Sequence, residues 1–127
     1  MQADIDGHQV KVVRSGARPS KRLVGDSGIP IRDGKTLPFV VSRGWNAPSG
    51  YYPEAFYLVN ADREVVFEGP PVTRLIWGLQ SVTDVEQEVR EPISLTPGTY
   101  TLVFMLADKV GAETTVEAFE APAEAAA

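Results

Sequence analysis

The stretch VEQEVREPISLTPGTYTLVFML, residues 85–106, decides the fold class. In its first half, every second residue from Val85 to Leu95 falls in one row that holds the large apolar side chains, and the other row is polar or charged. A two-residue period is typical of a β-strand with one buried face. Residues 82–89 also fit helical spacing, and Thr83 with Glu86 matches a helix-capping box. Because Pro92 would interrupt a helix, the pattern favours a strand, and one at the edge of a sheet.

The second half of the stretch predicts a tight turn followed by a central strand. Thr96-Pro97-Gly98-Thr99 has turn chemistry, because proline presets φ and glycine accepts a positive φ. In residues 100–106 both alternating rows are largely apolar. This composition predicts a strand that is covered on both faces.

The same alternation recurs along most of the chain. It predicts further short strands, separated by Pro/Gly turns, at residues 9–14, 37–43, 55–59, 64–68, 72–79 and 114–119. Residues 60–63 predict a hairpin connection. The predicted fold is all-β: a two-sheet antiparallel sandwich of about seven to eight short strands.

The segment LTPGTYTLVFML, residues 95–106, resembles the late hairpin of immunoglobulin-like and fibronectin-type domains. In those domains a Pro-Gly followed by Tyr and Leu opens the penultimate strand. The resemblance covers residues 37–119 and implies an immunoglobulin-like sandwich in which Tyr100 anchors the preceding corner. The Cys–Trp–Cys signature of true immunoglobulin domains is absent, since the chain has no cysteine.

Length and composition predict one domain over residues 1–127, a common size for a single core. We expect an N-terminal tail at 1–7, a basic Gly/Pro-rich loop or arm at 14–35, the main sandwich at 36–119, and a flexible Ala/Glu tail at 120–127.

The inventory of reactive residues predicts a protein that is not an enzyme and needs no cofactor or metal. With no cysteine and one histidine, His8, the chain lacks the residues for a zinc site or a Ser–His–Asp triad. No stretch has the length and hydropathy of a signal peptide or a membrane span, which predicts a cytoplasmic protein, or an extracellular one if a leader has been removed.

The segment RGWNAPSGYYPEAFY, residues 43–57, predicts a loop that binds a partner through aromatic rings. Arg43 and Glu54 are expected to add charged contacts at its rim. The predicted partner-binding residues are Arg43, Trp45, Asn46, Tyr51, Tyr52 and Glu54. The alternative is that Trp45 caps one end of the core and Tyr52 packs under Pro53. Trp77 shares a strand row with Leu75 and Leu79 and is predicted to lie in the core.

A second candidate is the basic segment 14–35. Its patch consists of Arg14, Arg18, Lys21, Arg22, Arg32 and Lys35. It predicts an arm around a neighbouring subunit, a site for a phosphate-bearing partner, or a solvated loop. Nucleic acid is an unlikely partner, because the net charge is −5 and no nucleic-acid-binding motif occurs.

The charge is divided unevenly along the sequence. Residues 1–63 carry 9 basic and 6 acidic groups, and residues 64–127 carry 3 basic and 11 acidic groups. We therefore expect a non-catalytic binding or assembly module that contacts a protein partner or its own copies through the aromatic loop or a sheet edge. The alternatives are a structural or decoration subunit of a larger particle and a carbohydrate or small-ligand binding module.

Overall fold

The computed structural model describes residues 4–22 and 27–122, and within these ranges the chain contains twelve strands and no α-helix. The strands are β1 (Asp4–Ile5), β2 (His8–Gln9), β3 (Lys11–Pro19), β4 (Ile29–Arg32), β5 (Lys35–Thr36), β6 (Phe39–Asn46), β7 (Gly50–Val59), β8 (Val65–Glu68), β9 (Val72–Ile76), β10 (Thr83–Val89), β11 (Gly98–Leu106) and β12 (Lys109–Glu120).

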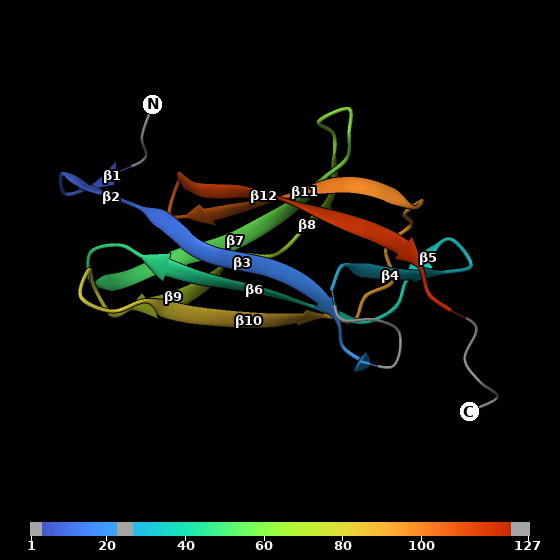
Figure 1. Ribbon diagram of the computed structural model, residues 1–127. Helices are drawn as coiled ribbons and strands as arrows, with labels where there is room; N and C mark the ends of the chain where they lie inside the picture. The colour runs from blue at the N-terminus through green and yellow to red at the C-terminus, as the bar shows by residue number, and fades with distance from the viewer. Residues whose placement is uncertain (1–3, 23–26, 123–127) are drawn as a thin grey trace.

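Two sheets form the body of the molecule, and a small β1–β2 hairpin extends from it (Figure 1). The smaller sheet is antiparallel, in the order β10-β6-β3. The larger sheet has seven strands in the order β5-β4-β12-β11-β7-β8, and β9 also pairs with β7. Both β8 and β9 run antiparallel to β7, one along each half of that strand.

The prediction of an all-β chain is confirmed, but the predicted two-sheet antiparallel immunoglobulin-like sandwich is wrong. The larger sheet is mixed, because β4 pairs with β12 in the parallel direction through Ile29–Ala118 and Glu120–Ile31. The strand β4 lies inside the segment 14–35, for which the sequence predicts a loop. Alternation along a strand reports which side chains are buried, but it carries no information about the direction of the neighbouring strand.

The core lies between the two sheets. In β6, the inward row is Phe39, Val41, Arg43 and Trp45, and each of these side chains is buried. The larger sheet contributes buried residues from β7 and β11, among them Phe56, Leu58, Leu102, Phe104 and Leu106. The apolar inward rows of both sheets thus explain why the chain closes into two layers.

A bend precedes β11, and Gly98 has the positive φ, 145°, that the sequence predicts. The hydroxyl of Tyr100 donates a hydrogen bond to the carbonyl of Thr96 at 2.9 Å and accepts one from the Thr96 amide at 3.2 Å. The ring of Tyr100 is buried. Tyr100 therefore anchors the preceding corner, as predicted, within a fold that differs from the one that the resemblance implied.

The segments outside the predicted sandwich are largely strands. Residues 14–35 contain most of β3, all of β4 and the start of β5, which puts 14–19 and 29–32 in sheets. At the N-terminus, residues 4–9 form the β1–β2 hairpin. The remainder of the predicted tails, at 1–3 and 123–127, and residues 23–26 of the predicted loop lie outside the described residues.

Candidate functional site

The aromatic residues of the predicted loop separate into buried and exposed ones. Trp45 is completely buried on β6, and Tyr52 is half-buried and donates a hydrogen bond to the carbonyl of Pro48 at 3.0 Å. Asn46 is also half-buried, and its side-chain amide donates to the carbonyl of Leu79 at 3.1 Å. Tyr51, by contrast, is 73% exposed. Of the three predicted rings, Tyr51 is therefore the most exposed.

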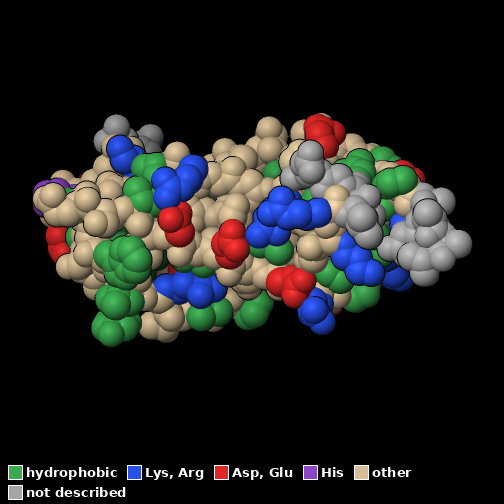
Figure 2. Space-filling model, turned by 60° about the horizontal axis from the view of Figure 1, so that its bottom comes forward, with side chains coloured by type: hydrophobic (Ala, Val, Ile, Leu, Met, Phe, Trp, Pro, Cys, Tyr) green, Lys and Arg blue, Asp and Glu red, His purple; other side chains and the backbone are tan. Residues whose placement is uncertain are grey.

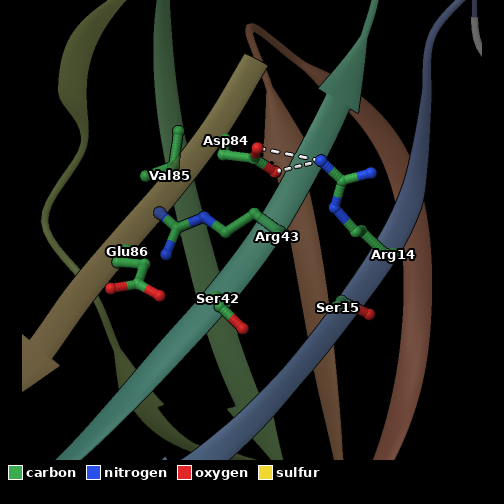
Figure 3. A pocket seen from close by; sticks show the side chains of 7 residues that line it. All are labelled: Arg14, Ser15, Ser42, Arg43, Asp84, Val85 and Glu86. Atoms are coloured by element: carbon green, nitrogen blue, oxygen red, sulfur yellow. Dashed lines mark hydrogen bonds and ion pairs between the residues drawn. The ribbon is translucent and has the colours of Figure 1, made fainter. Parts of the chain in front are cut away.

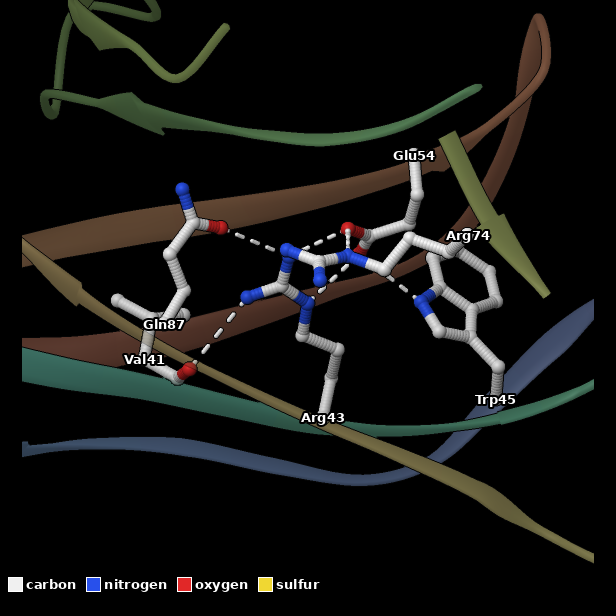
Figure 4. A network of polar contacts seen from close by, with 6 residues as sticks. All are labelled: Val41, Arg43, Trp45, Glu54, Arg74 and Gln87. Atoms are coloured by element: carbon white, nitrogen blue, oxygen red, sulfur yellow. Dashed lines mark hydrogen bonds and ion pairs between the residues drawn. The ribbon is translucent and has the colours of Figure 1, made fainter. Parts of the chain in front are cut away.

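Arg43 and Glu54 form a buried ion pair, so the prediction that they lie at the rim of a partner site is wrong (Figure 4). The guanidinium of Arg43 donates to both carboxylate oxygens of Glu54, at 2.6 Å from Nε and 2.5 Å from Nη2. Its Cζ atom lies 5.5 Å from the ring centroid of Phe56 and 5.8 Å from that of Phe104. The pair joins β6 of one sheet to β7 of the other.

Further donors surround the Glu54 carboxylate. The indole of Trp45 donates to it at 3.0 Å, and Nε of Arg74 donates to it at 3.1 Å. Burial alone would raise the pKa of Glu54, but the hydrogen bonds and charge of Arg43, with the hydrogen bonds of Trp45 and Arg74, lower it below its ordinary value. A carboxylate held ionised and fully hydrogen-bonded is unsuited to act as a general acid.

The surface that collects exposed apolar side chains lies on the outer side of β7 and β9. Tyr51 and Leu75 are directly opposite each other in the strand register, as are Pro53 and Thr73. Leu75 is 47% exposed, and Trp77, two positions further, is 66% exposed. Figure 2 shows hydrophobic side chains gathered at the end of the molecule where Figure 1 places β9 and its connection to β10. We call Tyr51, Pro53, Leu75 and Trp77 the aromatic face.

The position of Trp77 corrects the prediction that it lies in the core. The row Leu75–Trp77 has the apolar character of a core row, but in β9 the inward row is the other one, which contains Arg74 and the buried Ile76. The inward direction of this row is explained by Arg74, because its guanidinium reaches the buried carboxylate of Glu54. Sequence reasoning missed Leu75, Trp77 and Arg74 as surface or site residues.

The predicted basic patch is not assembled on a single arm. Arg14 and Arg18 project from the outer face of β3, where Arg14 contacts Asp84 on β10 at 2.8 Å and Arg18 contacts Glu86 at 3.4 Å. Arg32 donates to the carbonyl of Pro122, and Lys35 donates to the hydroxyl of Ser94. Lys21 and Arg22 follow β3 and are exposed. Basic and acidic side chains alternate across the middle of the face in Figure 2.

The Arg14–Asp84 pair spans the central strand of its sheet (Figure 3). Gly44 on β6 lies between the two partners in the register. A Cβ atom at Gly44 would lie 2.7 Å from a methyl carbon of Val82 and 3.0 Å from Oδ1 of Asp84. Glycine at this position therefore leaves room for the ion pair. A shallow pocket beside it is lined by Arg14, Ser15, Ser42, Arg43, Asp84, Val85 and Glu86.

Few groups in the described residues are suited to metal or acid–base chemistry. His8 is exposed on the β1–β2 hairpin. Residues 4–22 and 27–122 contain no cluster of three or more His, Cys, Asp or Glu side chains that could hold a metal ion. In the same ranges no helix has the length and apolar character needed to cross a membrane.

Comparisons with known proteins show similarity in structure alone. The chain matches no model of a protein family and none of the curated proteins. One similar solved structure is the alkylpurine DNA glycosylase AlkC of Pseudomonas fluorescens, bound to DNA that contains an abasic-site analogue. The TM-score is 0.54 and the sequence identity is 11%, and the match covers 87% of this chain and 30% of the glycosylase. At this identity the comparison shows a related fold that forms less than a third of the other chain.

Proposed function

We propose that this chain is a non-catalytic binding module that docks a protein partner through the aromatic face. The observation that supports it is the exposure of Tyr51 on β7, Leu75 on β9 and Trp77 directly after β9, at 73%, 47% and 66%. Single exposed apolar residues are ordinary, but contiguous large ones on a monomer are typical of interaction sites. Tyr and Trp are also the residues most enriched in binding hot spots.

The pairing of the charged side chains favours a binding function over a catalytic one. Among the carboxylates that the structure describes, Glu54 is the most deeply buried; it accepts hydrogen bonds from Arg43, Trp45 and Arg74 and has a lowered pKa. A catalytic carboxylic acid needs a raised pKa and access to substrate. The charged groups that line the shallow pocket on the smaller sheet already have partners: Arg14 pairs with Asp84, and Glu86 lies 3.4 Å from Arg18, which is outside the pocket.

The net charge of the chain and the ion pairs of its arginines favour a protein partner over a nucleic acid. The glycosylase was solved bound to DNA, but similarity at 11% identity does not carry that activity over. Nucleic-acid binding relies on uncompensated Lys and Arg that meet phosphates. Here Arg14 and Arg18 meet carboxylates, and the net charge of the chain is −5.

The double variant Tyr51→Ala/Trp77→Ala tests the proposal. We expect this variant to retain a partner from the native source at least about tenfold more weakly than the wild-type protein, because truncating a hot-spot residue commonly costs more than 1 kcal/mol of binding. Quantitative mass spectrometry would identify the partner, and calorimetry with the purified partner would confirm direct binding.

The matched control is Val13→Ala/Val65→Ala, which removes two exposed apolar side chains away from the aromatic face. Both double variants should keep the melting temperature of the wild type, because the four side chains are exposed. Equal retention of the partner by the wild type and Tyr51→Ala/Trp77→Ala would refute the proposal.

A carbohydrate is the second candidate ligand, and the two exposed rings of the aromatic face favour it, since aromatic rings also stack on the apolar faces of sugars. Trp45 is buried and Trp77 is exposed, so a sugar stacking here would perturb the fluorescence of Trp77. Titration with a glycan panel would detect it, with Trp77→Phe as the control. A flat response to the whole panel would eliminate this candidate.

A further inference from the structure

Two unpaired strand edges lie on either side of a groove beside the aromatic face. Among the described strands, β9 pairs with β7 alone and β10 pairs with β6 alone, so each has one edge without a neighbouring strand. At one end of the groove, the amide of Trp77 donates to the hydroxyl of Thr83 at 2.9 Å. The groove is lined by Thr73, Arg74, Leu75, Trp77, Thr83, Asp84, Val85 and Glu86. Such edges offer backbone N–H and C=O groups to an added strand.

Arg74 gives the groove a fixed cation. Its Nε atom donates to Oε1 of Glu54 at 3.1 Å, and its side chain is 26% exposed. Within residues 4–22 and 27–122, no hydrogen bond joins its two terminal nitrogens to another group. A guanidinium held at one side by a buried carboxylate has lost much of its rotational freedom, so it is organised in advance to bind a second carboxylate.

The charges around Arg74 leave an excess of positive charge at the base of the groove. Arg43 and Arg74 share one counter-charge, Glu54. The acidic residues that also line the groove have partners elsewhere: Asp84 is bound by Arg14 at 2.8 Å, and Glu86 lies 3.4 Å from Arg18. An additional carboxylate at Arg74 would therefore balance the charge of the Arg43–Glu54–Arg74 cluster.

We propose that an extended segment of the partner protein adds a strand to the free edge of β10 in this groove and places an acidic side chain on Arg74. The inference rests on the proposed function and specifies its binding mode. The backbone of the segment supplies affinity by pairing with β10, and the acidic residue fixes its register. Neighbouring side chains of the segment contact Trp77 and Leu75, which continue the groove into the aromatic face.

Peptide probes test this binding mode without needing the native partner. The first probe is an eight-residue peptide of alternating Thr and Val with a central Glu, and the second has Gln in place of that Glu. The third and fourth are versions of the Glu peptide in which every second backbone nitrogen is methylated: the odd-numbered nitrogens in one frame and the even-numbered nitrogens in the other. Binding is followed by the amide resonances of ¹⁵N-labelled full-length protein. We expect shifts at residues 83–89, about tenfold weaker binding of the Gln peptide, and loss of binding on N-methylation in one frame.

The protein variant is Arg74→Gln, and the matched control is Arg63→Gln, an exposed arginine on the β7–β8 connection that pairs with Glu113. Arg74→Gln should bind the Glu and Gln peptides equally, and Arg63→Gln should keep the preference for Glu. The Glu-to-Gln exchange on the peptide keeps the test decisive if Arg74→Gln fails to fold. Absence of binding, equal binding of both peptides to the wild type, or indifference to N-methylation in both frames would overturn the inference.

The two proposals fail in different ways. If Tyr51→Ala/Trp77→Ala loses the native partner while the peptides fail, the aromatic face binds in another mode and the strand-addition inference alone is rejected. If the variant keeps the partner, both the proposed function and the strand-addition inference are rejected.

Discussion

At the scale of single residues, Glu54 has the largest predicted effect on stability. Its side chain and that of Arg43 are fully buried, and Glu54 is the counter-charge of Arg43. The variant Glu54→Gln leaves the guanidinium buried and unpaired, which typically costs about 3–5 kcal/mol. Chemical denaturation would measure the loss of unfolding free energy. The control is Glu113→Gln, whose exposed ion pair with Arg63 should contribute little. Equal stability of the two variants would contradict this prediction.

The same residue predicts a loss of stability in acid. The pKa of Glu54 is lowered in the folded protein, so the folded state binds this proton less readily than the unfolded state. The resulting stabilisation is complete above the unfolded-state pKa, about 4.3 for glutamate, and disappears as the pH falls through the folded-state pKa. Melting temperatures measured from pH 7 to pH 3 should fall in the wild type. The fall should be smaller in Glu54→Gln, and parallel curves would show that other carboxyl groups are responsible.

The buried pair was within reach of the sequence. Arg43 shares its alternating row with Phe39, Val41 and Trp45, and Glu54 shares its row with Phe56 and Leu58. Two opposite charges on two core rows predict a buried ion pair. The general preference of charged residues for the surface points the other way, and it led to the wrong prediction that both lie at the rim of a loop.

At the scale of elements, the packing of the β11–β12 hairpin on the core depends on Gly111. A Cβ atom at this position would lie 2.2 Å from Cζ3 of Trp45, which is fully buried. Gly111→Ala should therefore destabilise the protein by about 1–3 kcal/mol, as overpacking does in well-packed cores. Gly16→Ala on β3 is the control, since nothing lies within 4 Å of its added Cβ. Thermal unfolding would compare them, and an unchanged Gly111→Ala midpoint would mean that Trp45 moves at little cost.

Strands were predicted correctly where apolar and polar residues alternate over a long stretch. They were missed where a strand forms only because it pairs with a distant strand. The strand β11 follows from the periodic rows of residues 100–106, and β10 follows from the first part of the row 85–95, since the strand ends at Val89. The strand β4 has four residues, in a segment rich in Gly, Pro and charge that resembles a loop. Its order depends on β12, a segment far away in sequence, and local composition contains no record of that contact.

At the scale of the whole molecule, folding joins the basic first half of the chain to the acidic second half. The ion pairs Arg14–Asp84, Arg18–Glu86 and Arg63–Glu113 each join one half to the other. We therefore expect the mass measured by light scattering to be the same at low and at high ionic strength, because the opposite charges are compensated within one molecule. Rings or filaments that form only at low salt would instead support head-to-tail assembly of a structural subunit.

The parallel contact between β4 and β12 also has a consequence for biosynthesis. Ile29 leaves the ribosome long before Ala118, its partner in the register, has been translated. At typical elongation rates the intervening residues take roughly 5–20 s to synthesise, during which β4 has no β12 to pair with. The seven-stranded sheet is therefore completed late in translation, after residues 109–120 have been made, and until then β5 is the partner available to β4.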